Sequence, residues 1–177
     1  MSQTDSAWKA FLELDDDPTI LVEFLSFVYV LQSRKDLIRL FNRYLQHHNK
    51  PTFGAATWLV KLKNMGVLEG HGNKVMVTRN MVEDVSCHSR SHQRSAQMCE
   101  FLDSNFYSKS LTLLLQARWA LYSGDGEWFL QLAQRRKSSK QESSESSDIV
   151  RIVSEGFSQT ESFSHLPQEM ALSLIHI

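Results

Sequence analysis

Four side chains in the middle of the chain have the residue types that bind transition metals: Cys87, His88, His92 and Cys99. Two histidines four positions apart share one face of a helix, which is a workable arrangement for zinc. The spacing of the four residues matches no zinc-finger pattern, and Cys99 falls among apolar neighbours. A buried cysteine beside surface histidines explains the same residues, so we expect neither a metal nor a cofactor.

Asp125 and Glu127 come nearest to a paired-carboxylate catalytic site. Gly124 and Gly126 lie beside them and favour a turn and a helix cap instead. The sequence contains no phosphate-binding P-loop, no dinucleotide-binding glycine motif and no nucleophile elbow. We therefore expect no catalytic residue and no enzyme activity within these residues.

Positive charge is concentrated in one part of the 177-residue chain, although the net charge is only −1. Residues 34–94 carry eleven Lys or Arg against four Asp or Glu, a net charge of +7, whereas residues 1–33 carry −5. Such a segment is suited to a phosphate backbone. The alternative is a solvated basic surface that the acidic N-terminal segment neutralises.

The composition is typical of a globular protein, with 42% hydrophobic and 22% charged residues. The longest apolar run, residues 20–31, includes Glu23 and is too short to cross a bilayer. The N-terminus lacks a basic and then apolar signal sequence, and two cysteines are too few for a disulfide framework. We expect a cytoplasmic protein that does not enter membranes.

Residues 52–78 predict a helix followed directly by a hairpin. Thr52 is a suitable N-cap after Pro51, and Gly66 supplies the left-handed position that ends a helix. Short β-prone runs at residues 67–69 and 74–78 flank a turn sequence, Gly-His-Gly-Asn. The buried side of the helix is predicted to consist of Ala55, Trp58, Leu59, Leu62 and Met65.

Two more helices are predicted upstream. Asp17 and Pro18 are expected to open a largely apolar helix over residues 18–31. Ser33 with Asp36 has the form of a capping box and predicts a second helix over residues 34–47. An acidic segment, residues 1–17, precedes both helices and holds a short helix near residues 7–14.

This order of three helices and a hairpin, over residues 18–86, resembles a winged-helix (winged helix-turn-helix) DNA-binding domain. The resemblance implies a mainly α fold with a small β-hairpin, in which the helix after Pro51 is the recognition helix and the hairpin is the wing. It also implies double-stranded DNA as the partner, contacted by Thr52, Thr57, Lys61, Lys63, Asn64, His71, Asn73, Lys74 and Arg79.

The outward side of the recognition helix contains no arginine, which is the commonest reader of guanine. Backbone contacts are therefore expected to outweigh base readout. Phe53 and Val60 lie on the same side and support an alternative, a protein partner bound through these two side chains.

The downstream chain predicts further helices and a change of composition. A helical turn over residues 80–86 completes the first domain, and a segment at 87–137 holds a helix over residues 91–106 and then a helical hairpin. A Ser-rich linker at 138–148 and an unassigned region at 149–171 follow. Residues 172–177 resemble a translated sequencing adaptor, so we expect the natural protein to continue; the alternative is a genuine apolar tail.

Residues 116–133, QARWALYSGDGEWFLQLA, resemble the N-terminal accessory region of bacterial SWI/SNF-type, DEAD-like helicases. The resemblance implies a non-catalytic module attached to a larger motor. The expected function is DNA binding by a winged-helix module, in a transcriptional regulator or in such an accessory region. The alternative function is a protein-interaction scaffold built from the winged helix and the helical hairpin.

Overall fold

The chain is mainly helical and carries a small three-stranded antiparallel sheet. The computed structural model describes residues 3–106, 113–125, 127–128 and 131–132. The chain divides into two compact units, Met1–Phe106 and Tyr107–Ile177. Among the described residues, no helix combines the length and the apolar character needed to cross a membrane.

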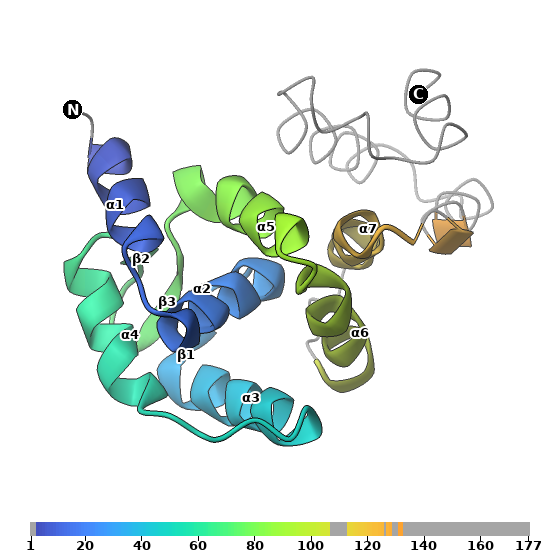
Figure 1. The fold of residues 1–177 in the computed structure, drawn as a ribbon, viewed down its shortest axis with the longest axis horizontal. Coiled ribbons are helices and arrows are strands. Elements are labelled where there is room, and N and C mark those ends of the chain that lie inside the picture. The colour runs from blue at the N-terminus through green and yellow to red at the C-terminus, as the bar shows by residue number, and fades with distance from the viewer. Residues whose placement is uncertain (1–2, 107–112, 126, 129–130, 133–177) are drawn as a thin grey trace. The chain divides into compact units, whose positions relative to one another are not determined.

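The core of the first unit is built around α2 (Asp16–Val28), where every residue from 21 to 28 is buried. This helix contacts α3, α4, α5, α6 and β3, and Figure 1 shows it in the middle of the unit. It begins earlier than predicted, with Asp15 and not Asp17 at the N-cap position. It also ends at Val28 and not at Leu31, because Tyr29 adopts a left-handed conformation with φ of 58°.

The Ser33 half of the predicted capping box is confirmed at the start of α3 (Arg34–His47). The Ser33 hydroxyl accepts from the Asp36 N–H at 3.2 Å and donates to the Asp36 carboxylate at 2.5 Å. Ser33 also belongs to a short strand, β1 (Gln32–Ser33), which was not predicted. The buried side of α3 consists of Leu37, Phe41, Tyr44 and Leu45.

The helix predicted after Pro51 is α4 (Ala55–Asn64), and it starts later than expected. Gly54 and not Thr52 occupies the N-cap position. Ala55, Leu59 and Leu62 are buried as predicted, whereas Trp58 is half-buried and Met65 is 37% exposed. The buried stripe is therefore narrower than predicted, because Met65 lies beyond the last helical turn.

Gly66 ends α4 in the predicted manner, with φ of 76°. Its N–H donates to the Lys63 carbonyl, and the Val67 N–H donates to the Leu62 carbonyl. These two bonds form the Schellman arrangement that closes a helix on a left-handed residue. The Thr78 hydroxyl also donates to the Gly66 carbonyl at 2.6 Å, which ties the end of α4 to the end of the hairpin.

The predicted hairpin is present as β2 (Leu68–Glu69) and β3 (Lys74–Val77). The sheet has the order β1-β3-β2, and both pairings are antiparallel. Gln32 pairs with Val75, and Leu68 pairs with Val77. The strand just before α3 therefore extends the hairpin to three strands.

The region after the hairpin differs from the predicted short turn and single helix. A 3₁₀ turn, η1 (Arg79–Met81), leads into α5 (Val82–Ser91), and α6 (Ser95–Asn105) follows. The two helices are separated by a Schellman arrangement in which Gln93 is left-handed, with φ of 59°. Because glutamine is an unusual residue for this position, the sequence pattern did not indicate the break.

The N-terminal helix α1 (Gln3–Leu12) packs onto the unit through Ala7 and Phe11, which are buried. Trp8 stacks on Phe11, with ring centroids 5.2 Å apart. The His88 ring of α5 meets the Phe11 ring edge-on at 5.1 Å. The acidic N-terminal segment thus contributes part of the core of the first unit.

In the second unit the structure describes α7 (Leu113–Ser123) and a few residues after it. Gly124 follows with φ of 79°, and the Asp125 carboxylate accepts from the Trp128 N–H at 2.9 Å, as expected for a helix cap. Most of the second helix of the predicted hairpin lies outside the described residues. The Ser-rich linker at 138–148, the region at 149–171 and the tail at 172–177 do so as well.

Candidate nucleic-acid interface

The solvent-facing side of α4 is polar, with an apolar interruption. Thr57, Lys61 and Asn64 are exposed and lie opposite the buried Ala55, Leu59 and Leu62. Val60 is also on this side and is 46% exposed. Thr52 is exposed in the segment that precedes the helix. The helix thus presents hydroxyl, amide and ammonium groups to solvent beside one apolar side chain.

Lys61 lies against a neighbouring aromatic ring. Its ammonium nitrogen is 4.6 Å from the centroid of the half-buried Trp58 ring. A cation over the face of an indole is attracted by the negative face of the ring. This contact holds the positive charge on the helix surface while the side chain remains exposed.

Lys63 has a structural bond in addition to its charge. Its ammonium donates to the carbonyl oxygen of Gly70 at 3.1 Å, across the start of the β2–β3 turn. An ammonium group has three hydrogens, so two of its donors are left for other acceptors. Lys63 therefore links α4 to the hairpin and is less exposed than Lys61.

The turn between β2 and β3 presents the predicted polar residues. His71, Asn73 and Lys74 are all exposed. The Lys74 N–H donates to the His71 carbonyl at 3.1 Å, and the Asn73 carbonyl accepts from the Arg34 N–H at 2.8 Å. The turn is therefore fixed by its own backbone and by the first residue of α3.

Arg79 is exposed at the start of η1, directly after the hairpin. Its backbone N–H donates to the Glu69 carboxylate at 3.3 Å, so this hydrogen bond does not use the guanidinium. Glu69 is exposed and brings a negative charge to the same side of β2. A phosphate bound near Arg79 would also be repelled by the negative charge of the Glu69 carboxylate.

Arg34 is a basic residue beside this surface that was not among the predicted DNA contacts. It starts α3, and its backbone bond to Asn73 places it at the turn of the hairpin. The signal in the sequence was the basic pair Arg34 and Lys35 after the capping serine. The pairing of β1 with β3 brings Arg34 to the hairpin.

The two side chains predicted to form a protein contact are in different environments. Phe53 precedes α4 and is half-buried, with its ring edge-on to Phe41 at 5.7 Å. Val60 is exposed on the helix. The expected pair on one outward helix face is therefore not formed, because Phe53 lies outside the helix and packs on α3.

The four residues with metal-binding side chains also differ in their environments. Cys99 is buried in α6, as its apolar neighbours suggested, and Cys87 is half-buried. Within the described part of the chain, the group of potential ligands that lie close together consists of Glu23, His88 and His92. The sequence feature that could have indicated this group is Glu23, the one acidic residue in the apolar run of residues 20–31.

Eight of the nine residues predicted to contact DNA are exposed, and the ninth, Lys63, is half-buried. Comparisons with protein-family models, with curated proteins and with solved structures found no match to the chain.

Proposed function

We propose that residues 18–86 are a winged-helix module that binds double-stranded DNA mainly through its phosphate backbone. The observation that carries the proposal is the order of elements: helix α2, strand β1, helices α3 and α4, and the β2–β3 hairpin, with β1 pairing to β3. In this order α4 has the place of the recognition helix and the hairpin has the place of the wing.

The exposed chemistry of α4 and the hairpin supports the same partner. Lys61 and Lys74 supply positive charge, and Thr57, Asn64 and Asn73 can donate to phosphate oxygens. The Lys63 bond to Gly70 joins the two elements that would contact the duplex. A major groove is wide enough to admit a helix such as α4.

The proposed binding is weakly selective for base sequence. The exposed face of α4 offers Thr57, Lys61 and Asn64 but no arginine fork for guanine. Such a module is non-catalytic and serves either a transcriptional regulator or the accessory region of a larger helicase-like protein. The sequence of the gene that encodes this chain distinguishes these two settings.

Charge reversal at two exposed lysines tests the proposal. Lys61→Glu and Lys74→Glu should each weaken binding to a random-sequence duplex. Removing one phosphate contact should also reduce the slope of log K against log salt by about 0.9, the value for one phosphate contact on B-DNA. Fluorescence anisotropy of a labelled duplex at several salt concentrations measures both effects with the full 177-residue chain.

Lys9→Glu is the matched control, because Lys9 is an exposed lysine of α1 outside the proposed surface. This variant has the same change in net charge and should keep the wild-type salt slope. Equal binding by the wild type, Lys61→Glu and Lys74→Glu would show that this surface does not bind DNA.

The alternative function, a protein-binding scaffold, rests on the exposed apolar side chains of the same region. Val60 is 46% exposed in α4 and Met65 is 37% exposed just after it. Val60→Asp separates the two proposals. Loss of a protein partner together with unchanged DNA affinity and salt slope favours the scaffold.

A further inference from the structure

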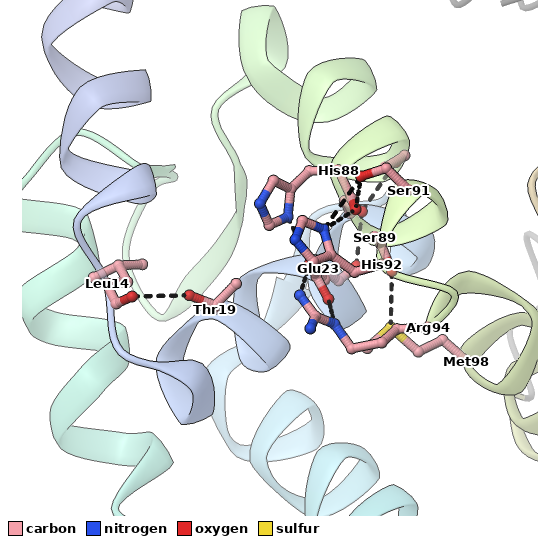
Figure 2. Close-up of polar contacts among 11 residues, drawn as sticks. Leu14, Thr19, Glu23, His88, Ser89, Ser91, His92, Arg94 and Met98 are labelled. Carbon is pink, nitrogen blue, oxygen red and sulfur yellow. Dashed lines mark hydrogen bonds and ion pairs between the residues drawn. The ribbon is translucent and has the colours of Figure 1, made fainter.

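Three potential metal ligands lie together away from the proposed DNA surface. They are Glu23 of α2, His88 of α5 and His92, the residue that follows α5. Their ligand atoms all lie within 4.8 Å of one another. Figure 2 shows these side chains gathered with Arg94 at the junction of α5 and α6. Glu23 is fully buried and His92 is exposed, so the group reaches from the core to the surface.

Hydrogen bonds define which nitrogen of each histidine is available. Nδ1 of His88 lies 2.8 Å from the Glu23 carboxylate, and Nδ1 of His92 lies 2.8 Å from the His88 carbonyl oxygen. Both partners are acceptors, so Nδ1 carries the proton in each neutral ring. The lone pair of both rings is then on Nε2, the form in which imidazole binds a metal.

Glu23 is suited to orient a ligand and not to be one. Its Oε1 accepts from His88 and from the Arg94 Nη2 at 2.6 Å, and its Oε2 accepts from the Arg94 Nε at 2.7 Å. Direct ligation would have to displace one of these donors. A carboxylate that accepts from the Nδ1–H of a metal-binding histidine holds the ring in position and raises its basicity.

The rings of His88 and His92 lie close together, as expected for residues four positions apart at the end of one helix. The centroids of His88 and His92 are 4.2 Å apart, and the ring planes differ by 32°. Two nitrogens bound at zinc distances across a tetrahedral angle lie roughly 3.3 Å apart. Binding one ion through both Nε2 atoms therefore requires the two side chains to rotate from this arrangement.

We propose that His88 and His92 bind one divalent transition-metal ion, with Zn²⁺ as the test case, and that Glu23 positions His88 for it. The two imidazoles supply two ligands through Nε2, and water or an external group completes the coordination. The Arg94 guanidinium neutralises Glu23, so the site relies on imidazole donors. This site is separate from the DNA surface and does not depend on that proposal.

Zinc titration of the full chain after chelator treatment tests the site. Isothermal titration calorimetry measures affinity and stoichiometry, and histidine NMR spectra identify the rings that respond. The wild type should bind one ion and shift the Nε2 signals of His88 and His92. His92→Ala should weaken zinc binding at least tenfold, because it removes one of the two ligands from an exposed position.

Two further variants distinguish zinc binding at His88 and His92 from binding to any exposed histidine. His71→Ala removes an exposed histidine of the hairpin turn and should leave zinc affinity unchanged. Glu23→Gln should weaken binding about 10–100-fold, the usual effect of losing such a carboxylate, and circular dichroism confirms that this variant is folded. Absence of zinc binding by the wild type, or wild-type affinity in His92→Ala, would overturn the proposal. Wild-type affinity in folded Glu23→Gln would overturn the orienting role.

Discussion

Lys61 and Lys63, the two lysines near the end of α4, make different contacts with the rest of the fold. Lys61 rests on the Trp58 ring and is exposed, whereas Lys63 donates to the Gly70 carbonyl. A change at Lys63 therefore alters both charge and the link to the hairpin. Lys61 and Lys74 are the cleaner probes of DNA binding, since the hydrogen bond at Gly70 does not involve their side chains.

Tyr44 shows how burial changes the chemistry of a single residue. It is 1% exposed in α3 and lies 5.0 Å from the Phe24 ring, between centroids. Burial, with a smaller contribution from the Glu23 carboxylate, raises the pKa of Tyr44 to about 12. The neutral phenol is therefore favoured in the folded protein.

This shift predicts a loss of stability at high pH. Between about pH 10 and pH 12 the unfolded chain releases the Tyr44 proton while the folded chain retains it. The free energy of unfolding should fall by about 2–3 kcal/mol across this window. Urea denaturation at several pH values measures the decline. Tyr44→Phe should remove this part of it, and Tyr29→Phe, which keeps Tyr44, should not; the same decline in both variants would contradict the assignment.

At the scale of elements, the hairpin depends on one glycine more than on another. Gly70 has φ of 151°, and a Cβ there would overlap the carbonyl oxygen of Lys74. Gly72 is left-handed with φ of 58°, but a Cβ there would meet no atom within 4 Å. A side chain at Gly70 would therefore meet both steric overlap and backbone strain, whereas one at Gly72 would meet backbone strain alone.

Alanine at these positions should have unequal effects. Gly70→Ala should cost about 2–5 kcal/mol, because strain and overlap with backbone add together. Gly72→Ala should cost about 1–2 kcal/mol, the usual penalty for a left-handed residue with a side chain. Urea denaturation gives both values. If the two variants were equally stable, the close approach of Gly70 to Lys74 would not constrain the hairpin.

At the scale of the whole first unit, a buried ion pair joins helices that are far apart in sequence. Glu23 of α2 is fully buried and receives two hydrogen bonds from Arg94, which lies between α5 and α6. The hydrogen bond strengthens the charged form of arginine and raises the pKa of Arg94. The side chain of Arg94 is 24% exposed, so the two partners differ in access to water.

That difference predicts an asymmetric loss of stability. Arg94→Met leaves a buried carboxylate without its cation and should cost about 3–5 kcal/mol. Glu23→Gln leaves a guanidinium that reaches solvent and should cost less, about 1–3 kcal/mol. Lys9→Ala, which removes the exposed pair with Glu13, should change stability by at most about 0.5 kcal/mol. Denaturant titration compares the three; a smaller loss in Arg94→Met than in Glu23→Gln would contradict this account.

The sequence by itself determined the elements whose signals are local. The capping serine predicted the start of α3, Gly66 predicted the end of α4, and the turn glycines predicted the hairpin. These signals work because cap bonds and left-handed residues depend on a few neighbours in the chain. The polar residues proposed to contact DNA could be named for the same reason, since they follow from where the helix and hairpin lie.

Tertiary structure decided the features that join distant residues. The pairing of Gln32 with Val75 brings Arg34 to the hairpin, and Phe53 packs against Phe41 instead of joining Val60. The break at Gln93 turns the chain so that Arg94 reaches Glu23. No local pattern contains these contacts, because each depends on how the whole first unit folds around α2.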